Sequence, residues 1–204
     1  MGGSLLTYLI TRLVGLEQFP IYFFTDEAVQ TMLAFDFLRD RLHNYAQDFL
    51  PTFFENGSQY NLGLSVYLQV LPTLFFGKAI WVTRGVAALV TVLAAIWLGQ
   101  ALKRAFGSPY PWLAVLFLTL TPAWFLHSRT AFETSLAATF YAGFLYFYLL
   151  YRLENPRYLY AAVITGALAF YAYSPARMVM AVAGLLLFVI DFGYHRRHPR
   201  HLLW

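Results

Sequence analysis

The stretch from Ala79 to Leu102, AIWVTRGVAALVTVLAAIWLGQAL, decides the fold of this chain. It carries one charged side chain, Arg84, and it is longer than the roughly 20 apolar residues that a membrane-crossing helix needs. The basic pair Lys103 and Arg104 follows it directly. The whole chain of 204 residues is 60% hydrophobic and 12% charged, whereas soluble domains carry roughly 25% charged residues. The sequence therefore predicts an integral membrane protein.

The same composition argues against several other classes. The net charge of +4 comes from basic residues spread over short loops, which indicates orientation in a bilayer and no nucleic-acid partner. The chain has no cysteine, which excludes disulfides and thiolate metal sites. The N-terminus lacks a basic n-region and a small-residue cleavage site, so no cleaved signal peptide is predicted.

From the stretch Ala79 to Leu102 and the other apolar runs, we predict an all-α, polytopic transmembrane helix bundle of about six spans. The spans cover residues 4–24, 79–102, 111–126, 132–151, 158–172 and 177–191. The first span is weak because Arg12 and Glu17 interrupt it, and Pro122 breaks the third.

Residues 25–78 form a large first outer loop with two interfacial helices. Apolar residues at three- and four-residue spacing predict one helical face, in a segment too charged to span. That face comprises Ala28, Met32, Phe35, Leu38 and Leu42, whereas Leu33 and Phe37 fall outside it. The apolar run from Leu62 to Phe76 is only 15 residues long and contains Pro72, so an interfacial or re-entrant helix is expected. Asn56-Gly57-Ser58 is a turn signal between the two.

Charge fixes the expected sidedness. Three basic groups lie two spans apart and so share one side: Lys103/Arg104, Arg152/Arg157, and the tail with Arg196, Arg197 and Arg200. They hold half of the fourteen Lys and Arg residues, so this side is predicted to be cytoplasmic. If the run 62–76 lies flat, the first loop and the loops at 127–133 and 174–177 all face outside. If it crosses, the acidic pair in the first loop faces the cytoplasm; the short length and Pro72 favour the flat arrangement.

The acidic pair is Asp26-Glu27, at the end of the first apolar segment. A carboxylate at a membrane boundary is unfavourable unless it stays hydrated or paired, so both are functional candidates. The alternative is local: Asp26 caps the following helix and Glu27 favours its first turn.

The order of these features resembles the GT-C type membrane glycosyltransferases, in particular the protein-mannosyltransferase and aminoarabinose-transferase superfamily (glycosyltransferase family 39-like). The residues that carry the resemblance are Asp26-Glu27-Ala28 after the first span, Tyr60-Asn61 before the short helix, Arg84 at the head of the second span, Ser128-Arg129 followed by Glu133, and Arg177 in the last outer loop. The superfamily often has His-Pro-Pro or Lys-Pro-Pro before the short helix, where this chain has Asn61-Leu62-Gly63. Members are also longer, so residues 1–204 resemble the N-terminal part of a GT-C transmembrane domain.

The resemblance implies an inverting transfer of a sugar from a polyprenyl-phosphate donor to a lipid, glycan or protein acceptor. The reaction would take place at the extracytoplasmic face of the cell membrane. Such a transfer needs a base, for which Asp26 is the candidate. Glu27 is the second catalytic candidate, orienting the acceptor or a metal.

A departing lipid phosphate needs positive charge, so Arg129 and Arg177 are predicted to bind it, or alternatively to contact lipid head groups. Arg84 is a further substrate-binding candidate, with a structural ion pair to a first-loop acid as its alternative. Tyr60 is a substrate-binding candidate through the resemblance. His127 and Glu133 are additional site candidates, and a divalent metal stays open as a cofactor.

Two other classes compete with a transferase. A transporter would show an internal repeat and polar breaks at the middle of paired spans, neither of which is present. A non-catalytic membrane scaffold would tolerate replacement of Asp26 and Glu27.

Overall fold

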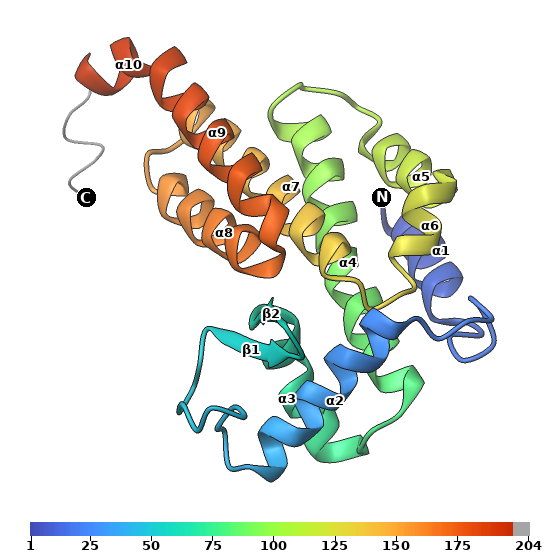
Figure 1. The fold of residues 1–204 in the computed structure, drawn as a ribbon. Coiled ribbons are helices and arrows are strands. Elements are labelled where there is room, and N and C mark those ends of the chain that lie inside the picture. The colour runs from blue at the N-terminus through green and yellow to red at the C-terminus, as the bar shows by residue number, and fades with distance from the viewer. Residues whose placement is uncertain (198–204) are drawn as a thin grey trace.

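The structure, a computed structural model, describes residues 1–197, and its core is a bundle of apolar helices (Figure 1). Two helices are long and apolar enough to cross a membrane: α4 (Ile80–Arg104) and α7 (Glu133–Leu153). The other helices of the bundle are shorter: α1 (Gly2–Leu13), α5 (Pro111–Leu120), α6 (Pro122–His127), α8 (Tyr158–Ala172), α9 (Ser174–Ile190) and α10 (Phe192–Arg197). The predicted spans 79–102 and 132–151 therefore correspond to helices of spanning length, and the remaining predicted spans form shorter helices.

Two predicted spans are interrupted. The helix expected over 4–24 ends at Leu13, and a non-helical strap runs from Val14 to Phe24. The predicted span 111–126 is divided into α5 and α6 at Thr121. The second break has a local cause, because the ring of Pro122 cannot continue a helix and instead begins a new one.

The bundle has two distinct ends. At one end, Arg104 pairs with Glu154 in the connection after α7, and Arg152 Nη1 lies 3.3 Å from the Asp191 carboxylate after α9. As far as the described residues extend, the three predicted basic groups lie at this end (Figure 1), while tail residues beyond Arg197, including Arg200, lie outside the described residues. The elements of the first loop gather at the opposite end (Figure 1).

The first loop contains two helices, as predicted, and a hairpin that was not predicted. The helices are α2 (Thr25–Arg39) and α3 (Leu64–Phe76); between them β1 (Phe53–Asn56) and β2 (Gln59–Leu62) pair antiparallel. The turn signal at Gly57 is where the hairpin closes, with a positive φ of 60° that suits glycine. Apart from this small sheet, the all-α prediction holds.

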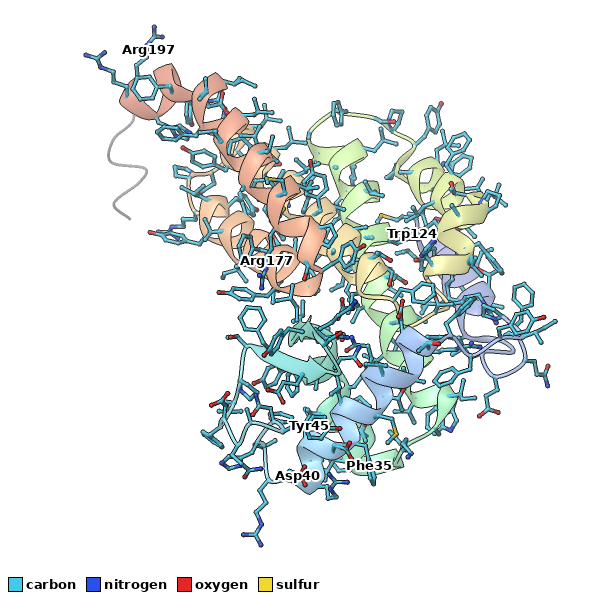
Figure 2. All side chains as sticks on the ribbon, viewed as in Figure 1. Phe35, Asp40, Tyr45, Trp124, Arg177 and Arg197 are labelled. Carbon is cyan, nitrogen blue, oxygen red and sulfur yellow. The ribbon has the colours of Figure 1, made fainter. Side chains whose placement is uncertain are left out.

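The predicted apolar face of α2 is not the face that packs on the core. Leu33, Ala34 and Phe37 are buried against β1 and α3, whereas Met32 and Phe35 are exposed. Sequence spacing finds an apolar stripe but cannot distinguish a core-facing stripe from a lipid-facing one. Figure 2 shows Phe35 on the side of α2 away from the bundle.

Helix α3 has its polar side inward. Ser65, Gln69 and Thr73, spaced four residues apart, are buried, whereas the residues exposed near its end are apolar: Leu71, Leu74, Phe75 and Phe76. A helix that faced water would present the opposite arrangement. This polarity fits a short helix lying against lipid, as its 13 residues and Pro72 suggest.

Candidate functional site

The most buried ion pair in the described residues joins Glu27 of α2 to Arg84 of α4. Arg84 Nε and Nη2 each donate to one Glu27 carboxylate oxygen at 2.9 Å, and neither side chain is more than 1% exposed. The backbone N–H groups of Phe24 and Ala131 also donate to this carboxylate, both at 3.1 Å. Glu27 therefore ties the start of α2 to α4 and to the α6–α7 connection, and it has no surface to offer a substrate.

Arg84 and Arg129 also determine the shape of the strap. Arg84 donates to the carbonyl groups of Leu16, Pro20 and Tyr22. Arg129 donates to five carbonyl contacts on the end of α1 and the strap, made by residues Thr11, Arg12, Val14 and Phe19. Beyond the last turn of α1, these carbonyl groups have no helical N–H donors. The guanidinium groups of Arg84 and Arg129 supply donors in their place, over a stretch where the sequence predicted a helix.

Arg129 is consequently a buried residue, 3% exposed, whose donors are all engaged. Burial, together with the positive charges of Arg12 and Arg84, lowers its pKa from the ordinary value. The structure therefore places two of the predicted substrate-binding arginines, Arg84 and Arg129, in the framework of the protein.

Asp26 lies in a different environment from its neighbour Glu27. It occupies the second position of α2, after the N-cap residue Phe24, so the alternative that Asp26 caps the helix is wrong. Its side chain is exposed, and no group within residues 1–197 hydrogen-bonds to its carboxylate. Asp26 therefore presents a free carboxylate where Glu27 presents none.

Asp26 borders a polar cavity of about 430 Å³ between α2, the hairpin, the α6–α7 connection and the start of α9. Four of the predicted site residues line it: Asp26, Tyr60, His127 and Glu133. Amide side chains of Gln30, Asn56, Gln59 and Asn61 line it too, together with Thr134, Tyr173 and Ser174. The three loops that the sequence predicts to face outside therefore meet around one space.

Several polar atoms at this cavity have no partner among the described residues. His127 Nδ1 and Thr134 Oγ1 are buried and accept or donate no hydrogen bond there. Glu133 differs, because one of its oxygens accepts a hydrogen bond of 2.6 Å from Gln30 Nε2. A cavity with free hydrogen-bonding groups and two carboxylates suits a hydroxyl-rich ligand.

Arg177 lies just outside this set, one helical turn along α9 from Ser174 (Figure 2). Its guanidinium carbon stands 4.9 Å from the centre of the Phe53 ring and 5.4 Å from that of Phe170. Within residues 1–197 it makes no ion pair, and its Nε is buried without a partner. Of the arginines predicted to bind substrate, Arg177 is the one with unused donors beside the cavity.

The donor set for a metal is incomplete. Within the described part of the chain, no three His, Asp or Glu side chains are grouped so that they could hold a metal ion. Although Asp26, His127 and Glu133 line the same cavity, they do not form such a group.

Taken together, the fold and site define a helical membrane protein with a polar cavity at one end of its bundle. Residues 64–203 match the family described as dolichyl-phosphate-mannose-protein mannosyltransferase. The match covers more than half of the chain, so the chain belongs to this family, which points to a membrane glycosyltransferase. Comparisons with curated proteins and with solved structures give no match.

The matched range includes Arg84, His127, Glu133 and Arg177 but begins after Asp26 and Tyr60. The roles of these two residues therefore depend on the cavity and on the sequence resemblance.

Sequence reasoning missed several residues that line the cavity. Gln30 had a readable signal, since it lies four residues after Asp26 and so on the same helical face. The hairpin amides Asn56 and Gln59 and the residue Thr134 had no such signal, because their position depends on how the loops fold together.

Proposed function

We propose that the chain carries the acceptor-activating part of a glycosyltransferase that uses a polyprenyl-phosphate sugar donor. Transfer inverts the anomeric carbon and takes place on the extracytoplasmic face of the cell membrane. The observation that carries the proposal is the free Asp26 carboxylate at the edge of a polar cavity in a chain of this family.

Asp26 acts as the general base. The acceptor hydroxyl gives its proton to the Asp26 carboxylate as its oxygen bonds to the anomeric carbon. The bond from that carbon to the donor phosphate oxygen breaks, and the electron pair leaves with the polyprenyl phosphate. The Asp26 carboxylate is exposed and accepts no hydrogen bond within residues 1–197, so it is available for this step, whereas Glu27, committed to Arg84, is not.

Arg177 stabilises the departing phosphate. Its fork of donors suits phosphate oxygens, and the flanking rings of Phe53 and Phe170 hold it in place. Arg84, Arg129 and Glu27 act indirectly, because they hold in place the strap and the start of α2, which carries Asp26. Tyr60, His127 and the amide groups of the cavity contact hydroxyls of the sugar or the acceptor.

The membrane placement follows from the same elements. Helix α3 lies in the outer interface with Leu74, Phe75 and Phe76 toward lipid, which keeps the cavity at the level where a lipid-linked sugar presents its head group.

The test is Asp26→Asn in the purified full-length protein, assayed for sugar transfer from a polyprenyl-phosphate donor. Asparagine keeps the shape but does not take a proton, so turnover should fall by roughly 10²–10⁴-fold. Glu17→Gln is the matched control, because Glu17 is an exposed acid of the strap before α2 that does not line the cavity. Near-normal turnover of Asp26→Asn would remove Asp26 from the mechanism.

A further inference from the structure

A chain of buried hydrogen bonds reaches the cavity from the interfacial helix α3. Ser65 Oγ of α3 donates to Gln30 Oε1 of α2, and Gln30 Nε2 donates to Glu133 Oε1 at 2.6 Å. Gln30 is 1% exposed and Ser65 is 2% exposed, so water does not compete for these bonds along most of the chain. Side chains of α3 and α2 thus form one hydrogen-bonded chain that ends at a single oxygen of Glu133.

In the structure the chain runs in one direction. If the Gln30 amide were turned over, its NH₂ group would no longer donate to Glu133 Oε1. In the observed orientation both neighbours are satisfied, because the Ser65 hydroxyl gives its proton to Gln30 and the Gln30 NH₂ group faces Glu133. Ser65 and Glu133 together therefore satisfy both ends of the Gln30 amide in this orientation.

Further buried polar groups continue the ladder away from the cavity, through the Ser65 backbone and not through its hydroxyl. Gln69 Nε2 donates to the Ser65 carbonyl at 3.2 Å, and Thr83 of α4 donates to Gln69 Oε1 at 2.9 Å. This ladder of polar residues links α2, α3 and α4, and by itself it would be only a structural feature. What sets its Gln30 end apart is that both Gln30 and Glu133 line the cavity.

The two oxygens of Glu133 are not equivalent. Oε1 is held by Gln30, and Oε2 accepts no hydrogen bond from any group within residues 1–197. Asp26 lies one helical turn before Gln30 on α2, so these two residues lie on the same helical face and both line the cavity.

We propose that Gln30 is a positioning residue of the transfer site, and that Ser65 of α3 fixes it. Gln30 pins one Glu133 oxygen so that the other accepts a hydrogen bond from the acceptor and orients the acceptor hydroxyl toward Asp26. Through Ser65 and Gln30, the interfacial helix α3 thereby sets how Glu133 is oriented relative to Asp26. This inference rests on the proposed function above.

The expected effect is on turnover more than on binding, because misorientation of a bound acceptor slows the chemical step. Losing one hydrogen bond to a charged group corresponds to roughly a ten-fold effect or more, so Gln30→Ala should lower kcat by about that factor with a smaller change in KM. Ser65→Ala should lower kcat less, and Ser65→Thr, which keeps the hydroxyl, should restore it.

Gln69→Ala is the matched control. Gln69 is a buried glutamine of the same ladder, 2% exposed, but it does not contact Glu133 or line the cavity. It should lower the melting temperature about as much as Gln30→Ala does while leaving kcat near that of the wild type.

The decisive experiment is a double-mutant cycle between Gln30 and Glu133, measured as sugar transfer from a polyprenyl-phosphate donor by the full-length protein. If Gln30 acts through Glu133, Gln30→Ala should produce no further loss of kcat in a Glu133→Gln background. Equal losses in both backgrounds, or a kcat loss in Gln69→Ala as large as in Gln30→Ala, would overturn the inference and leave the proposed function intact. Absence of sugar transfer by the wild-type protein would instead overturn the proposed function and, with it, this inference.

Discussion

Replacing Glu27 with glutamine should strongly destabilise the fold. The Glu27 carboxylate is 0% exposed and accepts four hydrogen bonds: two from Arg84 at 2.9 Å, and one each from the backbone N–H groups of Phe24 and Ala131 at 3.1 Å. Glutamine keeps one acceptor oxygen, but its NH₂ group must face either the Arg84 guanidinium or a backbone donor. The variant therefore leaves a buried positive charge without its counter-charge.

The magnitude follows from that burial. Breaking a buried ion pair by removing one partner costs about 3–5 kcal/mol. For a chain of this length each kcal/mol lowers the melting temperature by about 2–4 °C, so Glu27→Gln should melt roughly 6–20 °C lower.

The assay is thermal unfolding of the detergent-solubilised protein, followed by circular dichroism. Asp26→Asn is the adjacent control: Asp26 is exposed and unpartnered, so only its interaction with the helix dipole changes, worth about 0.3–1 kcal/mol. The double variant Glu27→Gln with Arg84→Met, which removes the stranded charge, should recover part of the loss. A Glu27→Gln melting temperature within about 2 °C of the wild type would refute the assignment of this pair to the framework.

Three further outcomes are expected. Arg129→Ala should lower the melting temperature markedly, because the strap carbonyl groups lose their donors. Arg177→Ala should melt near the wild type but use a polyprenyl-phosphate donor roughly ten-fold less well or worse. The reverse pattern would exchange the roles of the two arginines. Single cysteines at Asn56 and Lys78 should both be labelled from the outer face of intact cells, and labelling from opposite faces would show that α3 crosses the membrane. The Tyr45 pKa is raised to about 12, and the largest cause is the hydrogen bond that Tyr45 donates to Asp36. The stability that this interaction contributes is therefore complete below pH 10 and should be lost between about pH 10 and 12. A Tyr45→Phe variant with the same unfolding profile over that range would argue against this role of Tyr45.

Local features of the chain determined a large part of this protein. Hydropathy and length predicted the membrane class and located α4 and α7, because a helix that spans a bilayer needs a long run of apolar residues within one segment. The ordered polar loops indicated a family that the match to residues 64–203 confirms. The same ordering selected Asp26 and Glu133, which line one cavity although they are 107 residues apart.

Tertiary structure alone decided what the charged residues contact. Adjacent carboxylates look equivalent in sequence, yet Glu27 is sealed against Arg84 while Asp26 is free, because successive positions of a helix point in different directions. The strap replaces a predicted helix because Arg84 and Arg129 reach its carbonyl groups across 62 to 115 residues of sequence. Helical periodicity records the side chains within one segment, and it contains no information about which distant donor will satisfy a backbone oxygen or which apolar stripe will meet lipid.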